Sequence, residues 1–386
     1  MTSGFLPYGR QTISEEDINA VTAALRGALI TQGPAIAQFE AALAGTLGAK
    51  HVVAFANGTA ALHGAAFAAG LEEGDEVLTT PLSFAGSANC VLYQGARPRF
   101  VDISPSTLNL DGERVVREIG DRTRAVVTVS FAGLPADLEP FAPVRERVVV
   151  IEDASHALGA RRAGAPVGGP GGADLTTFSF HPVKAMTTGE GGAVATEDDE
   201  FARRLRLFRT HGITKESIDP SPTEGEWYYE MQALGYNYRI TDFQCALGLS
   251  QLAKLEEWVA ARNAIAEQYR ELLGSEERVA LPPAAPAGWL HGYHLFPVQI
   301  LAGAEARLAV FDAMRAAGIG VQVHYIPIYR LPYYRDVLGH PQDECPAAQA
   351  YYERALTIPV FPAMNVADVE RVVTTLGQAL DVVGSR

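Results

Sequence analysis

Cysteine is scarce in this sequence. Its three copies, Cys90, Cys245 and Cys345, are odd in number and show no CxxC spacing. This pattern argues against a disulfide framework and against a zinc or other metal site. We therefore expect no bound metal and a reducing compartment, the cytoplasm.

Positive charge is also limited. The 31 lysines and arginines are outnumbered by 45 aspartates and glutamates, so the 386-residue chain carries a net charge of −14. The basic residues form no cluster along the sequence. A surface that binds nucleic acid or an anionic membrane is therefore not expected, although a local pocket can still hold phosphate.

Long apolar runs are absent as well. No stretch reaches the roughly 18 apolar residues that a membrane span needs. The first residues, MTSGFLPYGRQTISEEDI, lack the basic region and the apolar core of a secretion signal. We expect a cytosolic chain that is complete as it stands and has no membrane partner.

Lysine is the rare basic residue. Only four basic side chains are lysines (Lys50, Lys184, Lys215 and Lys254), and Lys184 stands within FSFHPVKAMTTGEGGAV, among apolar and small residues. A guanidinium keeps its proton and cannot form a Schiff base, whereas a desolvated amine can become a nucleophile or a base. Lys184 is thus a candidate catalytic residue. The alternative is a lysine that extends from the sheet edge into solvent.

The order of the apolar runs predicts an α/β fold. Between residues 31 and 250, short runs rich in β-branched residues alternate with helical or turn-rich segments, which favours a mostly parallel sheet covered by helices. We expect an arm and helix over 1–30, this large domain over 31–250, and a linking helix with a small α+β domain over 251–386. The seven expected strands of the large domain are HVVAFA, DEVLTT, RPRFVDI, RAVVTVSF, VVVIED, DLTTFSF and GAVAT.

Several helix boundaries carry local signals. Ser14 with Asp17 predicts the start of a first helix, and Gly48 the end of a second. Thr241 with Gln244 predicts a capping box that opens one long helix, TDFQCALGLSQLAKLEEWVAARNAIAEQYRELLG, which would bridge the two domains. In the small domain, YHLFPVQI and GVQVHYIP are the expected strands, and ARLAVFDAMRAAG and VADVERVVTTLGQAL the expected helices.

Polar residues follow several predicted strands, where such sheets bind ligands. After HVVAFA, Gly58 and Thr59 open a helix whose first N–H groups can hold an anion. The alternative is an ordinary strand-to-helix turn with a threonine cap. After VVVI, Asp153 can hold a ring nitrogen protonated, or instead cap a helix or bind magnesium. His156 can support that acid or serve as a structural histidine.

Two further residues lie near strand ends. The hydroxyl of Ser179, five residues before Lys184, can reach a phosphate or bond to the backbone of a buried strand. Phe84, in TTPLSFAGSANC, can stack on a ring or pack in the core.

Together these residues suit one ligand, pyridoxal 5′-phosphate (PLP). PLP offers a phosphate for Gly58 and Thr59, a pyridine nitrogen for Asp153, and an aldehyde for Lys184. Lys184 would hold the aldehyde as a Schiff base, and Asp153 would keep the ring an electron sink.

The sequence also resembles a known family. FSFHPVKAMTTGEGGAV, TPLSFAGSAN, IEDASHALG, LITQGPAIAQFEAAL and GYNYRITDFQCALGLSQL resemble the DegT-type nucleotide-sugar aminotransferases, which have the aspartate-aminotransferase fold (PLP fold type I). The resemblance runs from about Pro7 to the last helix. Within the family, the lysine segment and VQVHYIPIY are most similar to the 4-aminotransferases of pseudaminic acid biosynthesis. A related branch of sugar dehydratases has histidine in place of Lys184, so the lysine favours transamination.

The resemblance implies specific roles for twelve residues. Lys184 would be the Schiff-base lysine and proton shuttle, and the family's homodimer shares its active sites between subunits. The implied cofactor contacts are Gly58, Thr59 and Ser179 to the phosphate, Asp153 to the ring nitrogen, Phe84 and His156 to the ring, and Asn237 from the neighbouring subunit; the implied substrate contacts are Thr31, Arg239, His324 and Tyr325.

The expected reaction moves an amino group from L-glutamate to the C4 ketone of a UDP-linked 4-keto-6-deoxy, N-acetylated sugar, as in pseudaminic acid biosynthesis. One alternative keeps the chemistry but uses a GDP- or dTDP-linked keto sugar, with a 3- or 4-amino product, or a keto-cyclitol. Others are a PLP-dependent sugar dehydratase and a regulatory PLP-binding protein.

Overall fold

A seven-stranded sheet forms the centre of the computed structural model, which describes residues 4–215 and 225–384. The sheet order is β1-β9-β8-β5-β4-β2-β3, and within it only β9 runs antiparallel to its neighbours. The prediction of a mostly parallel seven-stranded sheet is therefore confirmed. Its strands are β1 (His51–Phe55), β2 (Glu76–Thr79), β3 (Arg97–Phe100), β4 (Thr123–Val129), β5 (Val149–Asp153), β8 (Leu175–Ser179) and β9 (Gly192–Thr196).

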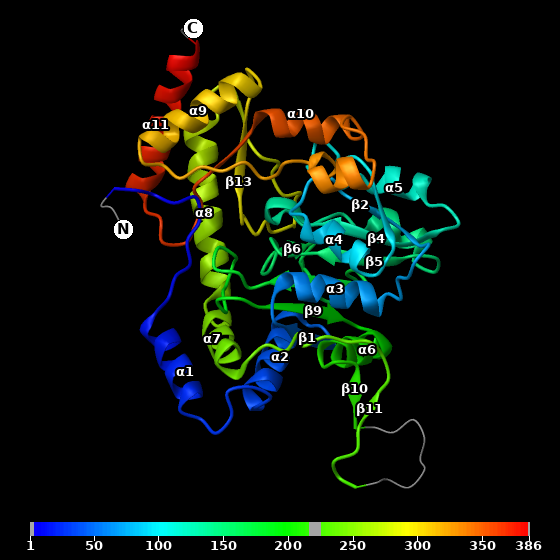
Figure 1. The fold of residues 1–386 in the computed structure, drawn as a ribbon. Helices are drawn as coiled ribbons and strands as arrows, with labels where there is room; N and C mark the ends of the chain where they lie inside the picture. Colours follow the sequence, from blue (N-terminus) through cyan, green and yellow to red (C-terminus); the bar gives the residue numbers. More distant parts are fainter. Residues whose placement is uncertain (1–3, 216–224, 385–386) are drawn as a thin grey trace.

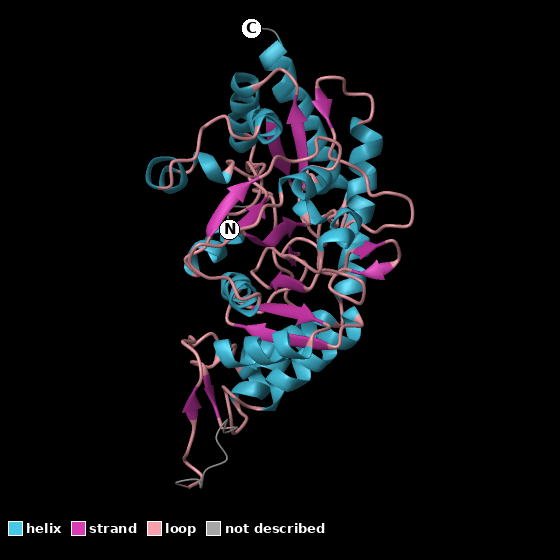
Figure 2. Cartoon of the chain, turned by 90° about the vertical axis from the view of Figure 1, so that its right-hand side faces the viewer, coloured by secondary structure: helices cyan, strands magenta, loops and turns pink. Residues whose placement is uncertain are grey.

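Helices cover both faces of this sheet (Figure 1), as the buried β-branched strands require. Alanine-rich α3 packs on one face, and α2 with α7 on the other. The helices of this part are α1 (Glu15–Leu25), α2 (Pro34–Leu47), α3 (Gly58–Ala68), α4 (Gly86–Tyr93), α5 (Gly112–Glu118), α6 (Asp199–Arg209) and α7 (Asp242–Leu252). Two-residue strands form the hairpins β6 (Arg161–Arg162) with β7 (Ala165–Pro166) and β10 (Ile213–Thr214) with β11 (Glu230–Met231); the latter projects from the body in Figure 2.

The predicted helix ends of the N-terminal region are confirmed. The backbone N–H of Ser14 donates to Asp17 Oδ2 at 2.9 Å, and Ser14 Oγ accepts from the N–H of Asp17 at 3.4 Å. Gly48 ends α2 with a φ of +71°, a left-handed conformation that glycine adopts without strain.

The prediction of one long helix from Thr241 was wrong, because the chain breaks it at Ala253 and Lys254 into α7 and α8 (Leu255–Leu273). The N–H of Lys254 donates to Gln251 three residues back, so a tight turn separates the helices. This turn directs the amine of Lys254 to Asp17, 2.9 Å away. Helix α8 contacts two hydrophobic cores: its first turns pack with α2 and α7, and its last turns pack with residues of the C-terminal region.

The second core belongs to the C-terminal region. Its remaining elements are β12 (Val279–Ala280), β13 (Phe296–Ile300), α9 (Ala304–Ala316), α10 (Pro346–Arg354), β14 (Ala355–Ile358) and α11 (Val366–Gly384), and the short turns of the chain are η1 (Phe131–Gly133), η2 (Glu139–Val144), η3 (Ile328–Arg330) and η4 (Tyr333–Val337). Sequence reasoning missed α10 and β14. No helix in the described part of the chain is long and apolar enough to cross a membrane.

The strand predicted at GVQVHYIP was also wrong. Only Gln322 pairs with β14, in an isolated bridge to Thr357. Side chains hold the rest of the segment, since His324 Nδ1 lies 2.9 Å from Thr357 Oγ1 and Tyr351 donates its hydroxyl proton to the carbonyl of His324. The segment therefore leaves the sheet, and His324 and Tyr325 line a pocket instead.

Candidate active site

A pocket of about 800 Å³ opens at the carboxyl ends of β1, β4, β5 and β8, where a parallel sheet binds ligands. This volume lies within the range of small-molecule sites. We call it the main pocket. It brings together nine of the twelve residues expected from the sequence, namely Gly58, Thr59, Phe84, Asp153, His156, Ser179, Lys184, His324 and Tyr325.

The start of α3 forms a cradle for an anion. Asn57 caps the helix by accepting the N–H of Ala60 at 2.8 Å, while within the described structure the N–H groups of Gly58 and Thr59 have no hydrogen-bond acceptor. A Cβ at Gly58 would lie 2.8 Å from Cβ of Ser179 and 3.0 Å from its Oγ. Only glycine therefore lets the helix start approach Ser179, and the cradle suits a phosphate.

Asp153 is buried at the end of β5, with 5% of its surface exposed. Its Oδ2 accepts the hydroxyl proton of Ser87 at 2.6 Å, and its Oδ1 accepts the N–H of Ser155 at 3.1 Å. Ser83 Oγ lies 2.7 Å from Ser87 Oγ. Because Ser87 donates its only hydroxyl proton to the carboxylate, Ser83 donates to Ser87. Sequence reasoning missed both serines, although they flank Phe84 at helical spacing in TTPLSFAGSANC.

His156 has a defined tautomer. The N–H of Ala132 donates to its Nδ1 at 3.2 Å, so the ring proton sits on Nε2, 3.3 Å from the hydroxyl of Tyr325. Burial holds the pKa of His156 well below its usual value, and the charge of Lys184 lowers it further. The imidazole is therefore a neutral hydrogen-bond donor at the pocket wall.

His294 is a pocket residue that sequence reasoning missed. Its ring centroid lies 4.4 Å from that of His156, and its buried Nδ1 has no partner in the described structure. Burial holds the pKa of His294 well below its usual value, and the charges of Lys184 and Arg262 lower it further. No local pattern in YHLFPVQI distinguished this histidine from a core residue.

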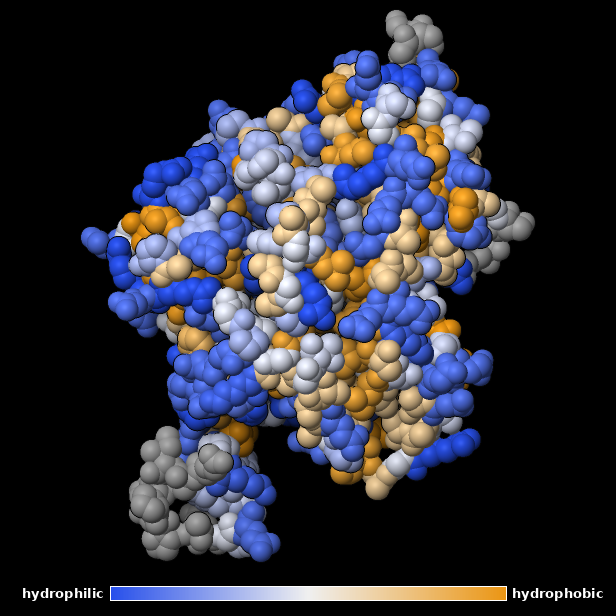
Figure 3. All heavy atoms as spheres, turned by 180° about the vertical axis from the view of Figure 1, so that it is seen from behind, coloured by the Kyte–Doolittle hydropathy of each residue, from blue (hydrophilic) through white to orange (hydrophobic). Residues whose placement is uncertain are grey.

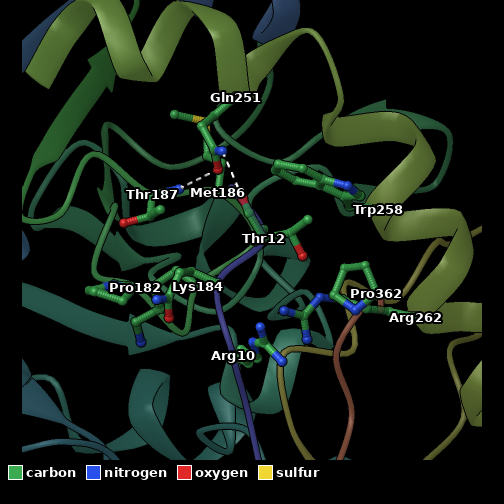
Figure 4. A pocket seen from close by; sticks show the side chains of 12 residues that line it. Arg10, Thr12, Pro182, Lys184, Met186, Thr187, Gln251, Trp258, Arg262 and Pro362 are labelled. Carbon is green, nitrogen blue, oxygen red and sulfur yellow. Dashed lines mark hydrogen bonds between the residues drawn. The ribbon is translucent and has the colours of Figure 1, made fainter. Parts of the chain in front are cut away.

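Lys184 borders the main pocket after β8. Burial lowers the pKa of its amine to about 8, and the opposing effect of Asp153 is smaller. The segment behind it is tied down, because Gln251 accepts the N–H of Thr187 at 3.3 Å and donates to the carbonyl of Thr12 at 3.0 Å (Figure 4). Lys184 therefore has an amine that is partly unprotonated near neutral pH, on a loop whose position these hydrogen bonds fix.

Three expected residues lie outside the main pocket. Thr31 and Asn237 are exposed, and they form isolated bridges to Thr241 and Thr210. Arg239 lines a separate pocket of about 260 Å³ between α2 and the end of α6. Within one chain, the structure does not bring these three to Lys184.

Matches to known proteins cover nearly the whole chain. The model of the DegT/DnrJ/EryC1/StrS aminotransferase family matches residues 11–377. The spore coat polysaccharide biosynthesis protein SpsC of Bacillus subtilis is 36% identical over 374 residues, which are 96% of this chain and 95% of SpsC.

Two similar solved structures also match nearly the whole chain. Helicobacter pylori PseC, an aminotransferase of pseudaminic acid biosynthesis, is 29% identical with a TM-score of 0.90 over 98% of this chain and 100% of PseC. The PLP form of Spr1654 from Streptococcus pneumoniae, a sugar aminotransferase by its description, is 26% identical with a TM-score of 0.91 over 98% of this chain and 99% of that chain.

Proposed function

This chain belongs to the DegT/DnrJ/EryC1/StrS aminotransferase family and is a PLP-dependent sugar aminotransferase, and we propose that it aminates the C4 ketone of a UDP-linked 4-keto-6-deoxy, N-acetylated sugar with L-glutamate as donor. The observation that supports this choice of sugar is the likeness to PseC over 98% of this chain and 100% of PseC. The product would be a UDP-4-amino-4,6-dideoxy sugar, as in pseudaminic acid biosynthesis.

The main pocket fits PLP residue by residue. The free N–H groups of Gly58 and Thr59, with the hydroxyl of Ser179, would hold the phosphate in the cradle that a Cβ at Gly58 would fill. Asp153 would pair with the ring nitrogen. Phe84, which is 65% exposed and lines the pocket, would be covered by stacking on the ring, with His156 beside it.

Lys184 would carry the proton in both half-reactions. Bound PLP supplies the electron sink that makes the Cα–H bond of the donor acidic. The neutral amine of Lys184 would take that proton from Cα of glutamate, and in the second half-reaction it would deliver a proton to C4 of the sugar. The lowered pKa of Lys184 supports this role, because it leaves part of the amine unprotonated near neutral pH.

A homodimer would complete the site. Thr31, Asn237 and Arg239 lie away from the main pocket of their own chain, and we assign them to the pocket of the partner subunit. The surface of α1 and the loop after it exposes apolar side chains, which supports an interface on this surface. These side chains are Ile18, Leu25, Leu29 and Ile30. Hydrophobic residues are also visible on the lower part of the molecule in Figure 3. A cytoplasmic location agrees with three free cysteines.

A coupled assay of 2-oxoglutarate release tests the substrate. The purified protein is given L-glutamate and, in turn, UDP-, GDP- and dTDP-linked 4-keto-6-deoxy sugars. We expect the highest kcat/KM with the UDP-linked, N-acetylated sugar, and a 4-amino product by mass spectrometry and NMR. A clear preference for another nucleotide, or a 3-amino product, would replace this proposal by the corresponding alternative, and sugar dehydration without 2-oxoglutarate would refute transamination.

A further inference from the structure

The loop that joins β8 to β9, residues 180–191, carries Lys184, and we call it the lysine loop. Helix α7 holds this loop through Gln251, whose Oε1 accepts the backbone N–H of Thr187 at 3.3 Å. Among the described residues, this is the hydrogen bond to a distant part of the chain that lies nearest to Lys184 in the sequence. The place of the Lys184 backbone therefore depends on how firmly Gln251 is held.

The position of Gln251 requires a side-chain amide. The residue is 1% exposed, and its Nε2 donates to the carbonyl of Thr12 at 3.0 Å (Figure 4) and to Oδ2 of Asp17 at 2.6 Å. A backbone N–H only donates and a carboxylate only accepts, so the partners fix the orientation of the amide. A leucine would make none of these bonds, and a glutamate would put a second carboxylate beside Asp17.

Asp17, on α1, holds the other end of Gln251. It is fully buried, and its Oδ1 accepts from the hydroxyl of Ser250 at 2.6 Å and from the amine of Lys254 at 2.9 Å. The N–H of Ser14 donates to its Oδ2 at 2.9 Å. Lys254 balances the charge of Asp17, so a neutral network joins α1, the end of α7 and the lysine loop. A buried polar network whose members are paired holds its geometry.

A fixed loop matters because little else holds the amine of Lys184. In the described part of the chain no hydrogen bond reaches this amine, which stands at the end of a flexible four-carbon chain. Proton transfer needs reacting atoms about 3 to 3.5 Å apart, and a misplacement of about 1 Å can lower a rate about a hundredfold. Neither Gln251 nor Asp17 lines the main pocket, so both would act on the reaction through the lysine loop.

We propose that Gln251 is a positioning residue for Lys184, and that Asp17 acts on the reaction through Gln251. A network outside the main pocket thus sets the place of the amine inside it. The proposal goes beyond the proposed function and rests on it only for the amino donor used in its first test. Because these residues contact neither the anion cradle nor the pocket wall, their loss should lower rates and leave affinities unchanged.

Gln251→Leu tests this role in the PLP-loaded enzyme. In stopped-flow experiments we expect L-glutamate to bleach the PLP absorption band about tenfold more slowly than in the wild type, with the KM for both substrates and the Kd for PLP unchanged within about twofold. With L-glutamate deuterated at Cα, the isotope effect on bleaching should rise, because proton transfer to Lys184 is the step that slows. Gln378→Leu, at an exposed position on α11, is the matched control.

A second readout needs no substrate. The absorption band of bound PLP titrates with the nitrogen that joins PLP to Lys184, and the pKa of this group depends on its place relative to Asp153. The pKa of the band should shift in Gln251→Leu, and less in Asp17→Asn, which keeps the side-chain volume but loses the charge that pairs with Lys254. In the double variant the two effects on rate should not add, since both act through the bond to Thr187.

The outcomes separate the positioning role from the proposed function. If L-glutamate does not bleach the wild-type band, the proposed donor is wrong, and the pKa of the band still decides the role of Gln251. A rate that falls without a change in the isotope effect or in the band, or a loss of melting temperature alone, refutes the positioning role. If Gln251→Leu does not fold, the same measurements on Asp17→Asn decide.

Discussion

Two buried charges flank Lys184, and the protein holds them in opposite ways. On the acid side, which comprises Asp153, Ser83 and Ser87, both carboxylate oxygens accept hydrogen bonds from the protein. On the arginine side, which comprises Arg10 and Arg262, no carboxylate of the described chain balances the charge. The buried carboxylate thus has a hydrogen-bond donor for each of its oxygens, whereas the buried guanidinium of Arg262 keeps an Nε that has no acceptor within the described structure.

Replacing Lys184 removes the residue that both sides share, and this has the largest expected effect. Lys184→Arg should lower transamination by about a thousandfold or more, since a guanidinium neither links to PLP nor loses its proton. Steady-state kinetics and circular dichroism measure activity and fold. Lys50→Ala, at an exposed lysine, is the control; sugar transamination by Lys184→Arg near the wild-type rate would contradict the assignment.

Gly58→Ala should weaken PLP binding on the acid side. The new Cβ would lie 2.8 Å from Cβ of Ser179, which forces the helix start away from the phosphate. We expect the Kd for PLP to rise about tenfold to a hundredfold, and the overpacking to lower the free energy of unfolding of the cofactor-free protein by about 1 to 3 kcal/mol. Fluorescence titration with PLP measures this. Gly45→Ala, where a Cβ meets nothing within 4 Å, is the matched control, and equal Kd values for both variants would exclude the cradle.

Ser87→Ala tests whether the acid side is built in advance. Removing the 2.6 Å hydrogen bond leaves Asp153 Oδ2 without its donor, so the carboxylate is less well oriented toward the ring nitrogen. We expect kcat to fall about threefold to tenfold and the pKa of the PLP absorption band to shift. Ser83→Ala removes a hydrogen bond to Ser87 and not to the carboxylate itself, so the changes in kcat and in the absorption band should be smaller. A loss of thermal stability with unchanged absorbance would instead mean that the serines only pack.

The lowered pKa of Lys184 predicts a pH dependence of stability in the cofactor-free protein. The folded-state pKa of about 8 lies below the ordinary value of 10.5, so between these values the unfolded chain binds more protons. Stability should therefore rise with pH across this window, and burial of the protonated amine costs stability below it. Urea unfolding at several pH values measures the rise. Lys184→Met should flatten it; an identical slope in both proteins would show that Lys184 is not desolvated.

The sequence predicted the parts of this molecule that depend on local patterns. Ser14 capping and the left-handed Gly48 carry their signals within a few residues, and the seven strands follow from apolar runs. The break before α8 depends instead on Lys254 reaching Asp17 across more than two hundred residues. The lost strand at His324 likewise depends on a side-chain bond to Thr357, which no pattern in VQVHYIP reveals.

The residues of the candidate site also fall into two groups, those that a local sequence pattern predicts and those that it does not. Lys184, Asp153 and Gly58 follow predicted strands, and the carboxyl ends of parallel strands meet at one edge of a sheet, so the strand pattern alone predicts that these residues lie together. Ser87 and Arg262 have no such signal, because one sits inside a helix and the other within a long amphipathic helix of ordinary composition. Both side chains are 1% exposed, and the sequence pattern does not reveal which groups they contact in the folded chain.

The most direct test of the central claim is the visible absorbance of the PLP-loaded protein through one full cycle. We predict a band that bleaches when L-glutamate is added and returns when the UDP-linked 4-keto-6-deoxy, N-acetylated sugar follows, with neither change in Lys184→Ala. A protein whose band does not respond to L-glutamate, or returns with a GDP- or dTDP-linked sugar but not with the UDP-linked one, would contradict the account.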